Sequence, residues 1–350
     1  MIRNLQALRA VAAYMVVLYH FLALQVAQIY PSARFLSFGA AGVDIFFVIS
    51  GFIMAVTTMK RDTTPSEFFL HRIARIVPVY WVVTFLLFSI ALCGFKPVGI
   101  MHVEWDWLAK SLVFIPFERD GHVTPIISVG WTLNYEMFFY VLFAAALFVK
   151  RALPRTLLLC LAISALVTAS LYSSQFGLLG EFYTTPIILE FAYGCALGYI
   201  FMRFQETKTG SSAPFYAMIL LGFLIIVVAQ IMREGPEPEL IGFTRPFVWG
   251  IAGLLIVTGT VFLERSNQIV PFDWLVELGN ASYSIYLIHA LLLHAAEKIA
   301  ERFFSMGTAF LATNFLIAVI GSAVGGLLLY RFVELPANLW LRARFPLRVK

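Results

Sequence analysis

The sequence predicts an all-α, polytopic integral membrane protein with about ten transmembrane helices and both termini in the cytoplasm. Its 350 residues are 61% hydrophobic and 13% charged, whereas a soluble domain is roughly 45–50% apolar and about 25% charged. Apolar runs close to the length that spans a bilayer as a helix recur along the whole chain. Basic residues gather in alternate connections between these runs, which is the positive-inside pattern.

Little polar chain lies between the apolar runs, so residues 1–350 are predicted to form a single transmembrane domain. The expected spans are residues 6–27, 40–59, 77–94, 128–149, 156–172, 184–202, 214–232, 246–263, 281–299 and 308–330. No small-residue cleavage site follows the first apolar run, so it is interpreted as a retained span rather than a signal peptide. With the N-terminus inside, most of the 25 Lys and Arg residues face the cytoplasm. We expect a location in a bacterial inner membrane.

Composition also argues against several classes of site. The three cysteines, Cys93, Cys160 and Cys195, are far apart in the chain and suggest neither a disulfide framework nor a metal site. The net charge of +5 comes from basic residues beside the spans, where they report orientation rather than nucleic-acid binding. We therefore expect no metal and no nucleic-acid partner, and the oligomeric state is open.

The first span carries two ionisable residues, Arg9 and His20. Such groups are costly within a bilayer, by at least about 2.5–3.5 kcal/mol near its centre, and are functional candidates for that reason. The two residues are 11 positions apart, which returns them to nearly the same helix face about 16 Å further along the axis. Two interpretations stay open: a functional pair, or a snorkelling arginine with a histidine satisfied inside the bundle.

Two carboxylates are candidates to orient His20 as a general base. Asp44 lies about one turn into the second span, and Glu136 about two turns below the outer surface in the fourth. The alternative for Asp44 is a carboxylate stabilised by the helix N-terminus. Glu190 is a weaker candidate, because Gly194 and Gly198 follow it at the spacing of close helix packing.

The segment before the third span carries Arg72 and Arg75, three positions apart and hence neighbours on one helix face. Thr64-Pro65-Ser66-Glu67 has the pattern of a helix N-terminus, which predicts a short interfacial helix leading into that span. A pair of guanidinium groups suits a pyrophosphate or a 3′-phosphate, since the planar fork binds phosphate oxygens bidentately. The alternative is ordinary positive-inside charge.

Polar residues also recur at helical spacing in the ninth span, at Ser282, Tyr286 and His289. They either line a path for a ligand or join helices by hydrogen bonds. The longest external connection, residues 95–127, contains Trp105 and Trp107 among polar groups. An interfacial aromatic belt is the preferred interpretation there, and stacking against a sugar is the alternative.

Taken together, these segments resemble the acyltransferase family 3 membrane proteins, in particular stand-alone bacterial members that acetylate exopolysaccharides. The resemblance rests on LRAVAAYMVVLYH at 8–20, GVDIFFVISGF at 42–52, HRIARIVPVYW at 71–81, WTLNYEMFFY at 131–140, LGNASYSIYLIH at 278–289 and RFVELP at 331–336. It covers nearly the whole chain. It implies about ten spans, an acetyl-CoA donor reaching the protein from the cytoplasm and an acceptor hydroxyl on the far side. It also implies that Arg9, His20, Arg72 and Arg75 are needed for activity.

The predicted function is therefore a membrane O-acyltransferase that moves an acetyl or other small acyl group from acyl-CoA to a sugar hydroxyl. Its acceptor would be a carbohydrate or a lipid-linked carbohydrate, reached within membrane lipid. His20 is the expected base, oriented by Asp44 or Glu136, and Arg9, Arg72, Arg75, Tyr286 and His289 are expected to bind the donor. The alternative is a proton-coupled transporter or flippase, because buried histidines and carboxylates also suit proton movement.

Overall fold

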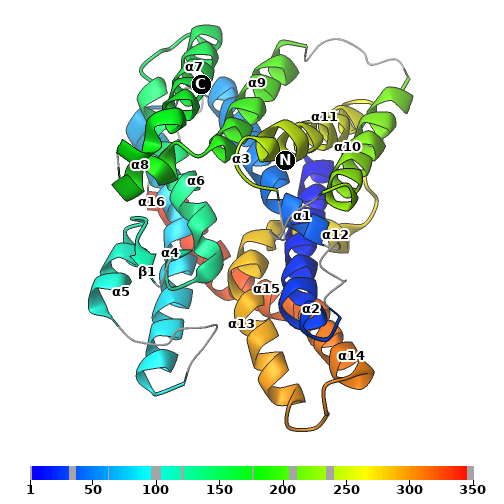
Figure 1. The fold of residues 1–350 in the computed structure, drawn as a ribbon. Helices are drawn as coiled ribbons and strands as arrows, with labels where there is room; N and C mark the ends of the chain where they lie inside the picture. The colour runs from blue at the N-terminus through cyan, green and yellow to red at the C-terminus, as the bar shows by residue number, and fades with distance from the viewer. Residues whose placement is uncertain are drawn as a thin grey trace.

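The computed structural model describes residues 2–30, 37–61, 63–95, 104–119, 122–175, 177–204, 211–233 and 240–344, and these are almost entirely helical (Figure 1). The α-helices are α1 (Arg3–Phe21), α2 (Ala27–Ile29), α3 (Gly42–Lys60), α4 (Pro65–Leu92), α5 (Trp105–Leu112), α6 (Trp131–Ala146), α7 (Ala152–Ala169), α8 (Gly177–Tyr183), α9 (Leu189–Arg203), α10 (Ala213–Ile231), α11 (Ile251–Arg265), α12 (Asp273–Asn280), α13 (Ser282–Ala300), α14 (Thr308–Leu316), α15 (Ser322–Leu329) and α16 (Leu335–Arg344). Two short strands, β1 (Glu118–Arg119) and β2 (His122–Val123), pair antiparallel.

Several helices contain a wider π-helical or a tighter 3₁₀ turn. The π-helical segments are η1 (Leu22–Val26), η7 (Pro246–Gly250), η8 (Ile317–Gly321) and η9 (Tyr330–Glu334). The 3₁₀ segments include η4 (Ser128–Gly130), η5 (Ser170–Gln175) and η6 (Pro186–Ile188). Single π-helical turns inside α-helices occur frequently at functional sites. The segment η1 begins two residues after His20.

Seven helical stretches in the described part of the chain are long and apolar enough to cross a membrane. They are Ser37–Lys60, Pro65–Leu92, Ala152–Tyr172, Pro186–Arg203, Ala213–Ile231, Pro246–Arg265 and Thr308–Leu341. The predicted all-α, polytopic membrane fold is therefore confirmed. The other three expected spans, 6–27, 128–149 and 281–299, form α1, α6 and α13, which carry His20, Glu136 and His289. The total of ten spans and the cytoplasmic termini stay predictions.

The segment with the two arginines forms one continuous helix, α4, of 28 residues. The predicted start is confirmed: Thr64 caps the helix, its side chain accepts from the Glu67 backbone, and Glu67 reciprocates. The expected separate interfacial helix is wrong, because the chain stays helical through Pro78. At 1.5 Å per residue α4 is about 42 Å long, so its first turns extend beyond the roughly 30 Å hydrocarbon core.

Glycines bring α3 and α9 into backbone contact. A Cβ atom added at Gly194 would lie 2.1 Å from the Val48 carbonyl oxygen, and one at Gly51 would lie 2.2 Å from that of Phe191. Neither position has room for a side chain. The expectation that Gly194 belongs to a helix-packing surface is thereby confirmed.

The connection expected at 95–127 folds into α5 and the β1–β2 hairpin, with residues 96–103 and 120–121 outside the described chain. Trp107 is buried, donates to the Thr124 carbonyl at 3.0 Å and lies under the Arg119 guanidinium. Trp105 is 69% exposed. Only Trp105 of the two is thus available for a place in an interfacial aromatic belt.

The helix α1 lies at the centre of the part that holds the candidate site. It packs against α3, α11, α12 and α13. Figure 1 shows α1 and α2 beside α13 and α14 at one end of the molecule, with α7 at the other. Side chains on α1 therefore face several helices that are remote in sequence.

Candidate active site

A cavity lies between α1, α3, α4, α6 and α13. Its charged lining residues are Arg9, Arg75 and Glu136. Much of the remaining lining is apolar, including Phe46 and Met54. The cavity thus combines a small number of charged groups with a largely apolar wall.

The arginines enter this cavity from two helices. Arg9 on α1 is buried and donates to the Gln6 side chain at 2.9 Å. Arg75 on α4 lines the cavity with it. Arg72 lies one turn earlier on α4, with its guanidinium 5.5 Å from the centre of the Phe68 ring, and is not among the lining residues. Arg9 and Arg75 are therefore brought together, and Arg72 adjoins them along α4.

Carboxylates accompany these positive charges. Glu136 accepts hydrogen bonds at one oxygen from the hydroxyls of Ser50, at 3.1 Å, and Tyr140. Glu334 is buried, accepts from Ser284 at 2.7 Å, and is close enough for its charge to act on Arg9 and Arg75. Glu334 was not predicted as a site residue, although its segment RFVELP was one of the recognisable motifs.

His20 has a second histidine as its partner. The rings of His20 and His289 meet edge to face, with centroids 4.8 Å apart, and His289 Nε2 lies 3.2 Å from His20 Nδ1. His289 is fully buried on α13. This contact joins α1 to α13 and was not predicted, because the sequence placed His289 among the donor-binding residues.

Tyr286 connects the histidine pair to the cavity. Its side chain lines the cavity and its hydroxyl donates to the Val129 carbonyl at 3.1 Å. Its own carbonyl oxygen lies 2.7 Å from His289 Nδ1. One turn earlier, Ser282 also lines the cavity, and its buried hydroxyl has no hydrogen-bond partner among the described residues. The sequence left two interpretations open for these positions, lining a path for a ligand or joining helices by hydrogen bonds. The positions of Ser282 and Tyr286 agree with the first, since both side chains line the cavity.

Asp44 occupies a different site from the one expected. Both of its oxygens accept hydrogen bonds from Arg245, each at 3.0 Å, in a bidentate pair. Glu190 is buried beside this pair and interacts electrostatically with both members. The prediction that Asp44 orients His20 is corrected, since Arg245 holds Asp44 and His289 contacts His20. The signal in the sequence was Arg245, an arginine just before an apolar run. Its spacing from Asp44 does not reveal that the two residues pair.

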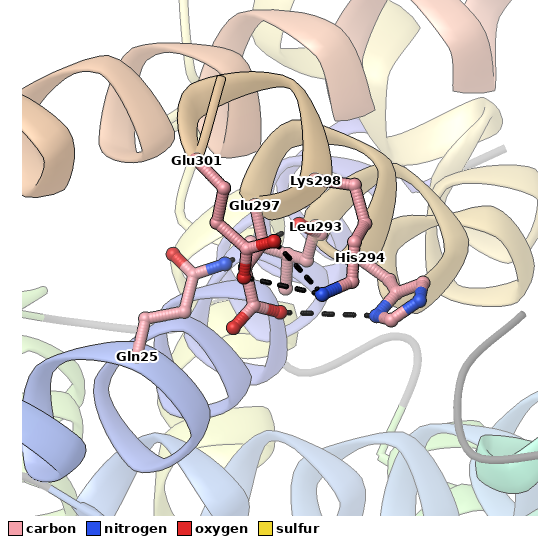
Figure 2. A network of polar contacts seen from close by, with 6 residues as sticks. All are labelled: Gln25, Leu293, His294, Glu297, Lys298 and Glu301. Atoms are coloured by element: carbon pink, nitrogen blue, oxygen red, sulfur yellow. Dashed lines mark hydrogen bonds and ion pairs between the residues drawn. The ribbon is translucent and has the colours of Figure 1, made fainter. Parts of the chain in front are cut away.

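Beyond the histidine pair, α13 carries a polar network towards its C-terminal end (Figure 2). The Gln25 amide donates to the Leu293 carbonyl at 3.3 Å, which ties η1 to α13. His294 lies 3.7 Å from Glu297, and Lys298 pairs with Glu301. Gln25 points across to α13 in Figure 2, whereas the other contacts stay within α13 and Glu301, the residue that follows it.

The chemistry available at this site is acid–base and anion-binding chemistry. A guanidinium group is a residue type that can bind phosphate oxygens bidentately, and an imidazole can transfer protons near neutral pH. Within the described residues, no group of three or more His, Cys, Asp and Glu side chains is placed to hold a metal ion.

Comparison with known proteins decides the family, because the model of an acyltransferase domain matches residues 2–331. The chain belongs to this acyltransferase family. It is 36% identical to the exopolysaccharide production protein ExoZ of Rhizobium meliloti, over 87% of this chain and 92% of that protein. No solved structure matches it significantly.

Two further relatives are named as O-acetyltransferases. The chain is 23% identical to the O-acetyltransferase OatA of Staphylococcus aureus, over 95% of this chain and 56% of that protein. It is 25% identical to the putative peptidoglycan O-acetyltransferase YrhL of Bacillus subtilis, over 96% of this chain and 54% of that protein. Together with its family, these matches identify this multi-pass membrane acyltransferase as an enzyme.

Proposed function

We propose that this acyltransferase moves an acetyl group from cytoplasmic acetyl-CoA to a sugar hydroxyl of an exopolysaccharide, another surface glycan or a lipid-linked precursor. It acts in a bacterial inner membrane. The names of the relatives support both the acetyl group and the polysaccharide acceptor.

The observation that carries the proposal is the placement of two functional groups along α1. Arg9 lines the cavity, and His20 lies about 16 Å further along the same helix, against His289. An extended donor with phosphates at one end and a reactive acyl group at the other matches this separation. Coenzyme A thioesters have that form.

The arginines of α4 supply the second half of the donor site. Arg75 lines the cavity together with Arg9, and Arg72 lies one turn nearer the capped start of α4, where the helix extends beyond the hydrocarbon core. Planar guanidinium groups bind phosphate oxygens bidentately. The nucleotide end is therefore held by Arg72 and Arg75, and the pantetheine arm lies along the apolar wall of the cavity.

At the far end, His20 takes the proton from the sugar hydroxyl while that oxygen attacks the acyl carbon. The new ester bond forms as the carbon–sulfur bond breaks. The CoA thiolate leaves and takes up a proton, so His20 returns to its neutral form. The apolar cavity wall around the donor arm keeps water from competing for the acyl group.

The test measures donor binding and transfer separately in the purified full chain. His20→Gln is expected to lower turnover at least about a hundredfold with acetyl-CoA still bound, since it removes only the base. Arg72→Ala and Arg75→Ala are each expected to weaken acetyl-CoA binding by about tenfold or more, because contacts between charged groups contribute roughly 1.5–3 kcal/mol. Calorimetry with acetyl-CoA measures donor binding, and transfer of the acetyl group from acetyl-CoA onto an oligosaccharide measures turnover.

Arg151→Ala is the matched control, because Arg151 is an exposed arginine at the start of α7, away from the cavity. It should bind the donor like the unmodified protein. Unchanged donor affinity in both α4 variants would remove the proposed donor site, and normal turnover in a folded His20→Gln protein would remove His20 as the base.

A further inference from the structure

The histidine pair fixes where its protons lie. His289 Nδ1 lies 2.7 Å from the carbonyl oxygen of Tyr286, and a carbonyl oxygen only accepts hydrogen bonds. His289 Nδ1 therefore carries a hydrogen. A second proton would leave a cation in a fully buried position, so the ring is neutral and Nε2 has a lone pair.

The same logic then determines the form of His20. The His289 Nε2 lone pair lies 3.2 Å from His20 Nδ1, so His20 Nδ1 is the donor in this contact. His20 Nδ1 also lies 2.9 Å from the Val16 carbonyl oxygen, which again only accepts. Both contacts agree that the hydrogen of neutral His20 is on Nδ1. Nε2 is therefore the nitrogen left with a lone pair.

We propose that His289 is a positioning residue that holds His20 in the tautomer whose Nε2 accepts the proton of the acceptor hydroxyl. When His20 takes up that proton it becomes an imidazolium, and its Nδ1–H bond to His289 becomes charge-assisted and stronger. His289 thus stabilises the protonated form of His20 more than the neutral form, and it does so at the stage of the reaction when His20 gains positive charge. This role rests on the proposed function, in which His20 is the base.

Two neighbouring contacts keep α1 and α13 in the register that the pair requires. The Gln25 amide donates to the Leu293 carbonyl just beyond the pair, as Figure 2 shows. Gln25 lies in the π-helical turn η1, which begins two residues after His20. On the cavity side, the Tyr286 hydroxyl bonds to Thr132 and Val129, which fixes the turn of α13 that supplies the carbonyl for His289.

A histidine in this position differs from the carboxylate that commonly orients a catalytic histidine. A carboxylate stabilises the imidazolium by its full charge. His289 is neutral and stabilises it only through a hydrogen bond. A neutral partner adds no buried negative charge on this side of the site, where the acceptor hydroxyl and the thioester carbonyl meet.

The first experiment compares two substitutions of the full-length protein. His289→Leu removes one of the two acceptors of His20 Nδ1–H and leaves only the Val16 carbonyl oxygen, so it is expected to lower kcat at least about tenfold with little change in acetyl-CoA binding. His289→Gln retains an oxygen acceptor near the position of Nε2 and is expected to recover much of that loss. His294→Leu is the control, because His294 lies on the same helix but pairs with Glu297; it should leave kcat unchanged.

The second experiment reads the tautomer directly, without substrate. Solid-state NMR of the full chain labelled with ¹⁵N-histidine in lipid bilayers distinguishes Nδ1–H from Nε2–H rings. The chain has six histidines, and the His20 signals are those lost in His20→Gln. We expect only the Nδ1–H form of His20 in the unmodified protein, and an Nε2–H form to appear in His289→Leu but not in His289→Gln.

These outcomes separate the positioning role from the proposed function. An Nε2–H ring at His20 in the unmodified protein, or full kcat in folded His289→Leu, overturns the positioning role. An unchanged tautomer in His289→Leu overturns it as well. Because the NMR measurement needs no acyl transfer, the expected tautomers together with an inactive unmodified protein would contradict the proposed function alone.

Discussion

At the scale of single residues, several buried charges in the described part of the membrane domain have a group of opposite charge or a hydrogen-bonding group close by. Arg9 has Gln6, Glu136 has Ser50, and Asp44 has Arg245. The sequence identifies such residues, because a charge within an apolar run is conspicuous. It does not identify their partners, because periodicity defines a face of one helix and says nothing about which helix packs there.

The pair formed by Asp44 and Arg245 allows a direct test of its role. Asp44→Asn should lower the free energy of unfolding by about 3–5 kcal/mol, because it leaves the buried Arg245 charge uncompensated. The double variant Asp44→Asn with Arg245→Gln should recover most of that loss, since it removes both charges. Thermal unfolding in detergent micelles gives the measurement.

The acetylation activity of the same double variant shows whether Asp44 serves only as the ion-pair partner of Arg245 or also acts in the reaction. A stable and active double variant assigns Asp44 to the ion pair alone. A stable but inactive one would show that the carboxylate acts on the reaction, as the sequence first suggested. Glu190 is unchanged in the single and the double variant, so its presence beside positions 44 and 245 is the same in both.

At the scale of elements, short sequence motifs correctly predict features that depend only on neighbouring residues or on one contact surface. The Thr64 capping box and the helix packing at Gly194 are both present. The length of α4 was not predicted, because Pro65 to Leu92 contains a polar half and an apolar half that resemble two elements. Pro78 did not end the helix, since neighbouring helices can accommodate a proline within a membrane segment.

The contact of α3 with α9 is tested at Gly194. Gly194→Ala should reduce the free energy of unfolding by about 1–3 kcal/mol, because its Cβ would lie 2.1 Å from the Val48 carbonyl oxygen. Gly321→Ala is the control, since its nearest neighbour would be 3.4 Å away, an ordinary contact. Equal stability of the two variants in detergent would argue against the close α3–α9 contact.

At the scale of the whole molecule, the apolar runs were sufficient to predict a polytopic helical protein. They were not sufficient to predict the site, which collects residues from α1, α3, α4, α6 and α13. His289 illustrates the difference: its spacing from Ser282 and Tyr286 placed it on the cavity face, and its contact with His20 depends on how α1 crosses α13. Such crossings follow from packing over the whole bundle.

The orientation of the bundle is accessible to labelling. In a protein lacking its three native cysteines, Glu104→Cys should react with an impermeant maleimide in intact spheroplasts, and Ser212→Cys only after the membrane is opened. The physical reason is the excess of Lys and Arg on the side assigned to the cytoplasm. Labelling of both positions from outside would contradict the assignment of the spans and of the termini.

The polarity of α1, α6 and α13 has a consequence for biosynthesis. A helix that carries Arg9, Glu136 or His289 gains less free energy on entering lipid than its purely apolar neighbours do, because polar side chains oppose transfer to hydrocarbon. Such segments are best accommodated when a neighbouring helix is already present to bind their polar groups. During synthesis, α13 emerges after its partner helix α1 and completes the histidine pair on arrival. The polar groups proposed to act in this enzyme's reaction therefore also make its insertion into the membrane a cooperative process.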